Sequence, residues 1–158
     1  MARPGPISPP RLPLFDRLLQ GDSIETDRNP DSAMRELRES VRRDLEILLN
    51  TRPARTVSGA EMRELGVSVL SYGLPGLQNQ NLATPAQQEA FRTELETIIQ
   101  RFEPRFRELE VELVGRDSSL DRTLRFRMRA ILQADGTSEA VVYDTVIDPA
   151  TGGLRILA

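Results

Sequence analysis

The spacing of apolar residues changes at Phe102-Glu103-Pro104-Arg105-Phe106, and this change constrains the fold more than any other feature of the chain. Before this segment apolar residues recur every three or four positions, and after it every second position, so helices should precede strands. Proline fixes its own φ and disfavours helical backbone in the preceding residue, so a helix should end at or just before Glu103. In an extended exit, Phe102, Pro104 and Phe106 would face the interior. Glu103 and Arg105 would then project together from the other face.

The residue pattern alone leaves two interpretations of the Glu103 and Arg105 pair. The first is a rigid element that docks on a protein partner, because a proline-stiffened pair loses little entropy on binding. The second is a helix stop with a local ion pair, and the pattern by itself favours this second interpretation. Further motifs are needed to decide between them.

Composition limits the chemistry that the chain can perform. The 158 residues fit one domain with a single core, and neither cysteine nor histidine is present, which excludes disulfides, thiol nucleophiles, histidine bases and the commonest transition-metal ligands. All 21 basic residues are arginine, and the net charge of −3 with mixed signs gives no electrostatic footprint for nucleic acid or an anionic membrane. Because no apolar run approaches a membrane span and no signal-peptide pattern opens the chain, we expect a cytoplasmic protein.

Residues 1–31 are expected to form a flexible proline-rich arm with one short amphipathic turn at residues 14–19. A domain over residues 32–158 should follow. Ser32 is the expected N-cap of its first long helix, which should end near Asn50 because Arg52-Pro53 follows. Apolar residues at three- and four-residue steps define the buried side of this helix: Met34, Leu37, Val41, Leu45 and Leu48.

A second long helix is predicted from Thr84 into the junction. Thr84 can cap the helix, Pro85 suits its first position, and Gln87 can complete a capping box. The inner stripe of this helix should be Phe91, Leu95, Ile98 and Phe102. Between the two long helices, residues 55–81 are expected to form a structured connector with a helical turn near residues 61–65.

Two strands with opposite charges on their outer faces are predicted beyond the junction. Residues 108–113 alternate leucine or valine with glutamate. In the second strand the arginines at 125, 127 and 129 alternate with Leu124, Phe126, Met128, Ala130 and Leu132. A loop centred between Ser118 and Ser119 gives three opposed pairs: Glu112 with Arg125, Glu110 with Arg127, and Glu108 with Arg129. A one-residue slip would turn the charges toward the core, so the charged stripes specify the register.

The C-terminal sequence predicts two further strands. Asp135-Gly136 is a strong two-residue hairpin signal and should return the chain into a third strand near residues 139–148. Gly152-Gly153 precedes a short fourth strand at residues 154–157, which should lie at a sheet edge. The predicted fold is therefore α+β, with two main helices packed on one face of a small antiparallel sheet of about four strands and an extended N-terminal arm.

The sequence contains no specific catalytic motif. Four carboxylates are available for glycoside hydrolysis: Glu61, Glu103, Asp117 and Asp121. With 24 acidic residues, however, a candidate pair arises by chance. The serines lack a histidine or lysine to activate them, and no phosphate-binding glycine motif is present. We therefore expect a protein that is not an enzyme and that uses no cofactor or metal.

Four segments carry a resemblance to a known family: residues 14–18, 40–52, 68–77 and 102–106. Their ordered motifs, Leu-Phe-Asp-Arg-Leu, Asn-Thr-Arg, Tyr-Gly-Leu-Pro and Glu-Pro-Arg, resemble those of the TssE family, the gene-25-like baseplate wedge subunits of bacterial type VI secretion systems. These subunits are related to a wedge protein of contractile phage tails. The chain departs from the family at Gly76, where an acidic residue often follows Leu-Pro.

The resemblance implies a structural adaptor. It implies that the chain joins the wedge subunits TssF and TssG, in a baseplate that also contains TssK, and helps the sheath proteins TssB and TssC to begin polymerising. The family's Glu-Pro-Arg element docks on the helical core bundle of the wedge, and this role carries over to Glu103, Pro104 and Arg105. Sheath strands would add to an exposed sheet edge. The implied location is the cytoplasm, at a baseplate docked near the inner membrane.

Two alternatives belong to other classes of protein. The first is a lysozyme-like glycosidase acting on peptidoglycan, because some gene-25-like proteins are described as lysozyme-like. The lack of an export signal and of an identifiable carboxylate pair argues against it. The second is a general protein-binding α+β domain outside secretion, with which the wedge subunits would not co-purify.

Overall fold

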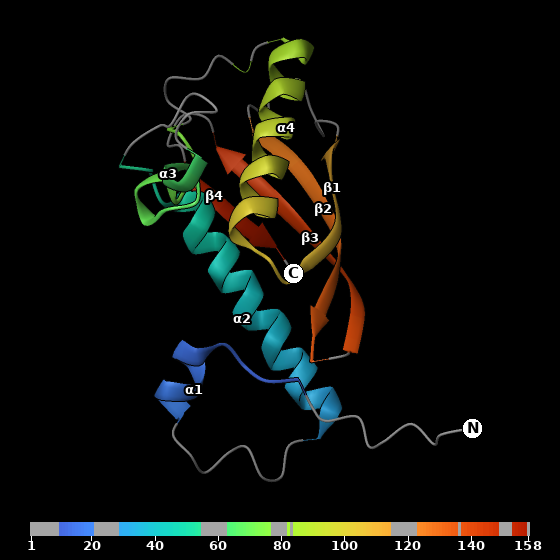
Figure 1. Ribbon diagram of the computed structural model, residues 1–158. Helices are drawn as coiled ribbons and strands as arrows, with labels where there is room; N and C mark the ends of the chain where they lie inside the picture. The colour runs from blue at the N-terminus through green and yellow to red at the C-terminus, as the bar shows by residue number, and fades with distance from the viewer. Residues whose placement is uncertain are drawn as a thin grey trace, which may run out of the picture.

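Two long helices lie against one face of a four-stranded antiparallel sheet (Figure 1). The computed structural model describes residues 10–20, 29–54, 63–76, 82, 84–114, 123–135, 137–148 and 153–157. The helices are α1 (Leu14–Gln20), α2 (Pro30–Asn50), α3 (Arg63–Gly66) and α4 (Pro85–Phe102), with one 3-10 turn, η3 (Val69–Ser71). The strands are β1 (Phe106–Val114), β2 (Leu124–Ala134), β3 (Thr137–Asp148) and β4 (Gly153–Leu157), ordered β1-β2-β3-β4. The predicted α+β fold is confirmed.

The N-cap of α2 is Asn29, and the prediction of Ser32 was wrong. The Asn29 side chain accepts a hydrogen bond from the backbone N–H of Asp31 (3.2 Å), and the Ser32 hydroxyl instead donates to the Asn29 carbonyl (2.8 Å). Asparagine caps a helix as well as serine does, so the earlier of two suitable residues starts this helix. The predicted end at Asn50 and the predicted buried stripe of α2 are confirmed.

The predicted capping box opens α4. The Thr84 hydroxyl accepts from the Gln87 N–H (3.3 Å), and the Gln87 side-chain oxygen accepts from the Thr84 N–H (3.1 Å). The inner stripe of α4 packs on the sheet, where the ring centroid of Phe91 lies 5.6 Å from that of Phe126 in β2. The helix ends at Phe102, as the proline two residues later requires.

The pairing of β1 with β2 lies two residues away from the predicted register. Glu112 lies opposite Arg127, where Arg125 was expected. Glu110 lies opposite Arg129, where Arg127 was expected. A shift of two residues leaves every side chain on its own face, so alternation in the sequence cannot distinguish these registers. The loop that would decide between them, with Ser118 and Ser119, lies outside the described residues.

The third predicted charge pair, Glu108 with Arg129, is also absent, because Arg129 lies opposite Glu110, and a β-bulge displaces Glu108 further. The register shifts between Arg107 and Glu110, and Glu108 has a φ of 50°, in the left-handed region that residues other than glycine seldom adopt. Glu108 is skipped in the residue pairing of β1 with β2 and does not lie opposite Arg129. The bulge explains why simple alternation failed near the start of this strand.

The C-terminal strands follow the prediction. Ala134 pairs with Thr137, so a two-residue turn joins β2 to β3, and Asp135 has the positive φ (45°) typical of such turns. β1 and β4 form the two edges of the sheet. At the β4 edge, the side-chain amide of Asn50 bonds both the N–H (3.1 Å) and the carbonyl (2.9 Å) of Leu154, which ties this edge to the end of α2.

Residues 10–13 pack on the domain, although they lie in the segment expected to form a flexible arm. Leu12 is buried in the core, and the N–H of Arg11 donates to the carboxylate of Asp135 at the β2–β3 turn (2.7 Å). The predicted short helix follows as α1. The rest of the expected arm, residues 1–9 and 21–28, lies outside the described residues.

The connector between the long helices contains α3, which lies at the predicted helical turn, and η3. Its flanks, residues 55–62 and 77–81, lie outside the described residues. Within the described part of the chain, no helix is both long enough and apolar enough to cross a membrane.

Candidate functional site

The junction after α4 is a turn, not the extended exit that its sequence predicted. The N–H of Glu103 bonds the carbonyl of Ile99 (2.8 Å), so Glu103 closes the helix. The N–H of Phe106 then bonds the carbonyl of Glu103 (3.3 Å), which folds Pro104 and Arg105 into the centre of a tight turn. Proline suits this turn because its fixed φ matches the first central position.

The turn also changes which side chains face the interior. Phe106 is buried as predicted, whereas Pro104 is exposed and Glu103 is only 5% exposed, opposite to the prediction for both. The prediction assumed the alternation of a strand, and the residues of a turn do not point to alternate sides. Glu103 therefore does not project to solvent beside Arg105 but is bound by it inside the protein.

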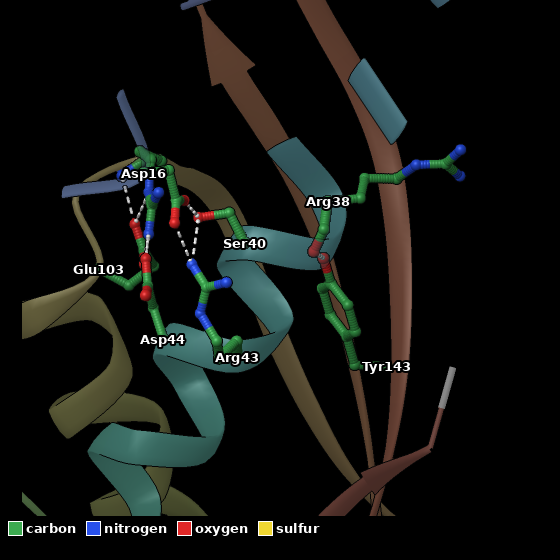
Figure 2. Close-up of polar contacts among 8 residues, drawn as sticks. Asp16, Arg38, Ser40, Arg43, Asp44, Glu103 and Tyr143 are labelled. Atoms are coloured by element: carbon green, nitrogen blue, oxygen red, sulfur yellow. Dashed lines mark hydrogen bonds and ion pairs between the residues drawn. The ribbon is translucent and has the colours of Figure 1, made fainter. Parts of the chain in front are cut away.

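Arg105 binds two carboxylates, that of Glu103 within the junction and that of Asp44 in α2. Both acidic residues are labelled in Figure 2. The Nε of Arg105 donates to Oε1 of Glu103 (2.5 Å) and its Nη2 to Oε2 of the same residue, so this pair is bidentate. The same Nη2 also donates to Oδ2 of Asp44 in α2 (2.8 Å). A bidentate, partly buried pair is stronger than a single exposed one. We refer to Glu103, Arg105 and Asp44 as the junction triad.

The junction triad keeps Arg105 ionised. Burial disfavours the charged guanidinium, but the hydrogen bonds and negative charges of Glu103 and Asp44 outweigh it, so the pKa of Arg105 lies above its ordinary value. The Glu103 side chain is 6% exposed, that of Arg105 24% and that of Asp44 36%. The triad is therefore an internal clamp that opens to solvent only at Arg105 and Asp44.

Asp44 was missed by the analysis of the sequence. It lies 61 residues before Arg105, on a helix surface rich in acidic and basic side chains, so its spacing does not mark it. Its place within segment 40–52, which carries the family resemblance, is the signal that could have found it.

The connector reaches the same region through Tyr72. Its ring meets that of Phe102 edge-on, with 5.3 Å between the ring centroids. The pKa of Tyr72 is raised, first by burial and then by the negative charges of Asp44 and Glu103. The phenol therefore lies within electrostatic range of the junction triad.

One buried carboxylate attaches α1 to α2. Asp16 is 7% exposed, and its Oδ2 accepts a hydrogen bond from the hydroxyl of Ser40 (2.5 Å). Its Oδ1 binds the guanidinium of Arg43, one turn further along α2 (Figure 2). A charge-assisted, nearly buried contact of this kind fixes the position of a short helix that would not be stable on its own.

All four segments that carry the family resemblance meet on α2 or at its end. The first segment attaches through Asp16, the third through a bond from the Leu74 N–H to the Thr51 carbonyl (2.9 Å), and the fourth through Arg105. Residues of the ordered motifs thus make the contacts that join distant parts of one domain.

A hollow of about 460 Å³ lies beside the junction. Its lining consists of residues 11–13, 102–105 and 133–135, together with Leu37 and Asp44. It combines apolar groups, such as Leu12 and Phe102, with the charges of the junction triad. This mixture suits a protein segment, since interfaces join an apolar centre to a polar rim.

Metal binding and glycoside hydrolysis were the two site chemistries to check among the described residues. These residues include no group of three or more histidine, cysteine, aspartate or glutamate side chains placed to hold a metal ion. Of the four carboxylates considered for glycoside hydrolysis, Glu103 is bound by Arg105. The other three, Glu61, Asp117 and Asp121, lie outside the described residues.

These features define a small α+β domain with a salt-bridged turn beside a hollow of mixed apolar and charged lining. Residues 35–137 match the family model for baseplate wedge protein gp25, and the chain belongs to this family. A search of curated proteins found no match. The family match begins within α2 and ends at the first residue of β3, so it contains the junction triad and Tyr72 but not α1. The protein is a structural baseplate wedge component of a contractile tail-like machine.

Proposed function

We propose that the chain is the TssE-type wedge subunit of a bacterial type VI secretion baseplate. In this role it binds TssF and TssG, in a baseplate that also contains TssK, and helps the sheath proteins TssB and TssC to begin polymerising. Its place of action is the cytoplasm, near the inner membrane. Membership in the baseplate wedge family supports the structural role, and the four ordered motif segments support the assignment to type VI secretion.

The shape of the junction supports the proposal that Glu103, Pro104 and Arg105 form the element that binds the wedge. Pro104 is exposed at a turn whose ends are fixed by hydrogen bonds at Glu103 and Phe106. The junction triad holds Arg105 in the same turn. A turn that is rigid before binding loses little conformational entropy when a partner docks.

The three residues have different roles in this contact. Pro104 and the exposed part of Arg105 touch the partner, which enters the adjoining hollow. Glu103 is a positioning residue, since it is nearly buried and acts by holding the guanidinium together with Asp44. The interpretation as a local ion pair and the interpretation as a docking element are therefore compatible. The junction triad that stabilises the turn also holds the turn in position for a partner.

Strand addition at a sheet edge is the proposed contact with the sheath. Helix side chains already form hydrogen bonds with part of each edge. Asn50 bonds Leu154 of β4, and Arg92 donates to the carbonyl of Val111 in β1 (3.1 Å). A sheath strand would pair with other backbone groups of an edge.

The proposed role needs no catalysis. A general acid must be free to give its proton to a substrate, whereas the carboxylate of Glu103 is bound bidentately by Arg105. The alternative is a lysozyme-like glycosidase. Clearing of peptidoglycan by the purified protein, abolished by one carboxylate substitution, would establish that alternative in place of the adaptor.

Co-purification tests the proposed function. The full chain carries an affinity tag and is co-expressed with TssF and TssG from the same genome. We expect both subunits to remain with the chain through gel filtration. If neither subunit is retained, the chain is a protein-binding domain outside type VI secretion.

A further inference from the structure

The two edges of the sheet differ in the backbone groups that they leave unpaired. Along an antiparallel edge strand, residues bonded to the inner strand alternate with residues whose N–H and carbonyl point outward. At the β4 edge both groups of Leu154 bond the side chain of Asn50, so Leu154 points away from β3. The next outward residue of β4 is therefore Ile156.

The same alternation extends across the sheet to β1. The pairings of β4 with β3 and of β3 with β2 run without a register shift. In β1, beyond the bulge, the alternation leaves the backbone groups of Val111 and Leu113 pointing away from β2. The bond from Arg92 to the carbonyl of Val111 agrees with this direction, because it arrives from outside the sheet (3.1 Å).

Asn50 closes the β4 edge. A side-chain amide offers a donor and an acceptor, as a peptide group does, and Asn50 uses both on Leu154. The same amide donates to the carbonyl of Glu46 in α2 (2.8 Å), which holds this short side chain in place. A strand that reached Ile156 would meet Asn50 at the next outward position. The described part of β4 therefore offers no run of backbone for an added strand.

The β1 edge stays open beside Arg92. A carbonyl has two acceptor positions, and Arg92 uses one of those on Val111. The outward N–H of Val111 and both outward groups of Leu113 have no hydrogen-bond partner within the described residues. Arg92 also bonds Glu89 (2.7 Å) and Glu96 (2.6 Å), so its side chain keeps two anchors if a strand takes its place on the carbonyl.

We propose that an extended strand of the sheath adds to the β1 edge at Val111 and Leu113, with an apolar side chain beside Leu113 and a basic side chain beside Glu110. This inference rests on the proposed function and names which of the two edges meets the sheath. An extended backbone presents donors and acceptors at the spacing of the outward groups of an edge, so a strand is the partner that this edge fits.

The apolar side chain follows from the exposure of Leu113. This residue pairs with Phe126, and its side chain lies on the face of the sheet that the helices cover. It is nevertheless 38% exposed, whereas Phe126 is fully buried. The helices therefore leave the end of β1 partly uncovered. An apolar side chain on an added strand would bury this remaining surface.

The basic side chain follows from the charges on the other face of β1. The carboxylate of Glu110 is exposed and makes no ion pair within the part of the chain that the structure describes. Three neighbouring arginines of β1 and β2 are bonded elsewhere: Arg129 to Glu112 (2.6 Å), Arg127 to Asp144 (2.7 Å) and Arg107 to Gln133 (3.0 Å). An added strand lies directly beside Glu110, so a basic residue there forms a cross-strand pair.

Photocross-linking identifies the edge directly. The chain has no cysteine, so a single introduced cysteine carries a benzophenone maleimide at one chosen site. Glu110→Cys labels β1 and Arg155→Cys labels β4, at exposed positions on the same face of the sheet. Each labelled full chain, in complex with TssF–TssG, is irradiated with purified TssB–TssC. We expect a product with TssB or TssC from Glu110→Cys and none from Arg155→Cys.

A pair of variants at one position tests the backbone contact. Leu113→Pro removes the outward N–H without removing a bond between β1 and β2, whereas Leu113→Ala shortens the side chain and keeps the N–H. A thermal melt establishes that both variants are folded. By biolayer interferometry, Leu113→Pro should bind TssB–TssC roughly tenfold or more weakly than Leu113→Ala, because a carbonyl of the added strand loses its donor.

A charge variant tests the basic side chain. Glu110→Gln keeps the size of the side chain and removes its charge, so affinity for TssB–TssC should fall about two- to fivefold. The control Glu64→Gln removes an exposed carboxylate from α3 and should bind as wild type.

Each other outcome overturns part of the inference. A product from the β4 label, alone or together with the β1 label, rejects the choice of edge. Equal affinities of Leu113→Pro and Leu113→Ala reject backbone pairing at β1, and unchanged affinity of Glu110→Gln rejects the basic side chain. If wild type keeps TssF–TssG but does not bind TssB–TssC, the inference and the sheath contact fail while the wedge contact stands. If wild type does not bind TssF–TssG either, the proposed function fails as well.

Discussion

Gly73 stands against the carbonyl oxygen of Thr51, so close that a Cβ added to the glycine would lie 2.2 Å from that oxygen. Its φ is +119°, which residues with a side chain rarely adopt. The contact joins the connector to the end of α2. The Tyr-Gly-Leu-Pro segment thus needs glycine at its second position for two independent reasons, space and backbone conformation.

Gly73→Ala should lower the free energy of unfolding by about 2–4 kcal/mol, because the backbone must move and the φ is strained. Urea denaturation checks this value. Gly76→Ala is the matched control, since the nearest atom to its added Cβ belongs to the flexible side chain of Arg52 at 3.9 Å. The control should lose less than about 1 kcal/mol. Equal losses in the two variants would contradict the close approach to Thr51.

Alkaline pH should destabilise the protein through Tyr143. Burial raises the pKa of Tyr143 to about 12, and its hydroxyl donates to the backbone carbonyl of Arg38 (3.1 Å; Figure 2). Folding therefore favours the neutral phenol. This contribution is fully present below the unfolded pKa of about 10 and is lost as the pH rises toward 12, by about 2–3 kcal/mol in total.

Denaturation of wild type and Tyr143→Phe at pH values from about 9 to 11.5 checks this prediction. The chain has no lysine and only 2 tyrosines, so little else titrates in that window. The variant should keep a smaller decline with pH from Tyr72, whose pKa is also raised by burial. The same pH dependence in both proteins would contradict the assignment to Tyr143.

Arg105→Ala should cost about 3–5 kcal/mol of stability, because it leaves the nearly buried carboxylate of Glu103 without its cation. The variant Glu103→Ala/Arg105→Ala removes both charges and should lose about 1–3 kcal/mol less than the sum of the two single variants. A double-mutant cycle by chemical denaturation measures this coupling. Additive losses would mean that the bidentate pair contributes no net stability.

Asp16→Asn should release α1 from α2 while the rest of the domain stays folded. Loss of a charge-assisted, nearly buried hydrogen bond costs about 1.5–3 kcal/mol, so amide protection in α1 should fall roughly tenfold or more. Hydrogen exchange read by mass spectrometry reports α1 and α4 separately. Asp31→Asn, at an exposed site in the first turn of α2, is the control. Unchanged protection of α1 would exclude Asp16 as its anchor.

Local chemistry predicted the elements of this fold well. The capping box at Thr84 and the proline after α4 act through neighbouring backbone, so the sequence contains the whole cause. The same reasoning failed at Ser32, because Asn29 is an equally good cap three residues earlier. The register of β1 against β2 failed by two residues, since alternation repeats every two residues and leaves such shifts undetected.

The site was harder to predict because its contacts span long stretches of chain. Strand alternation placed Glu103 outside, whereas a turn and Arg105 bring it inside. Asp44 and Asp16 are ordinary acidic residues in the sequence and gain their roles only when α2 packs beside the junction and α1. The hollow exists only in the folded domain, since its lining comes from three separate segments and α2.

The most direct test of the central claim is the affinity of Glu103→Ala/Arg105→Ala for purified TssF–TssG complex, with a thermal melt to establish that the variant is folded. The control Arg127→Ala/Asp144→Ala removes a bonded pair of opposite charges from the sheet instead (2.7 Å). We predict that the junction variant binds at least roughly tenfold more weakly and that the control binds as wild type. Wild-type affinity in a folded junction variant would contradict the account and move the search for the interface to residues 72–75.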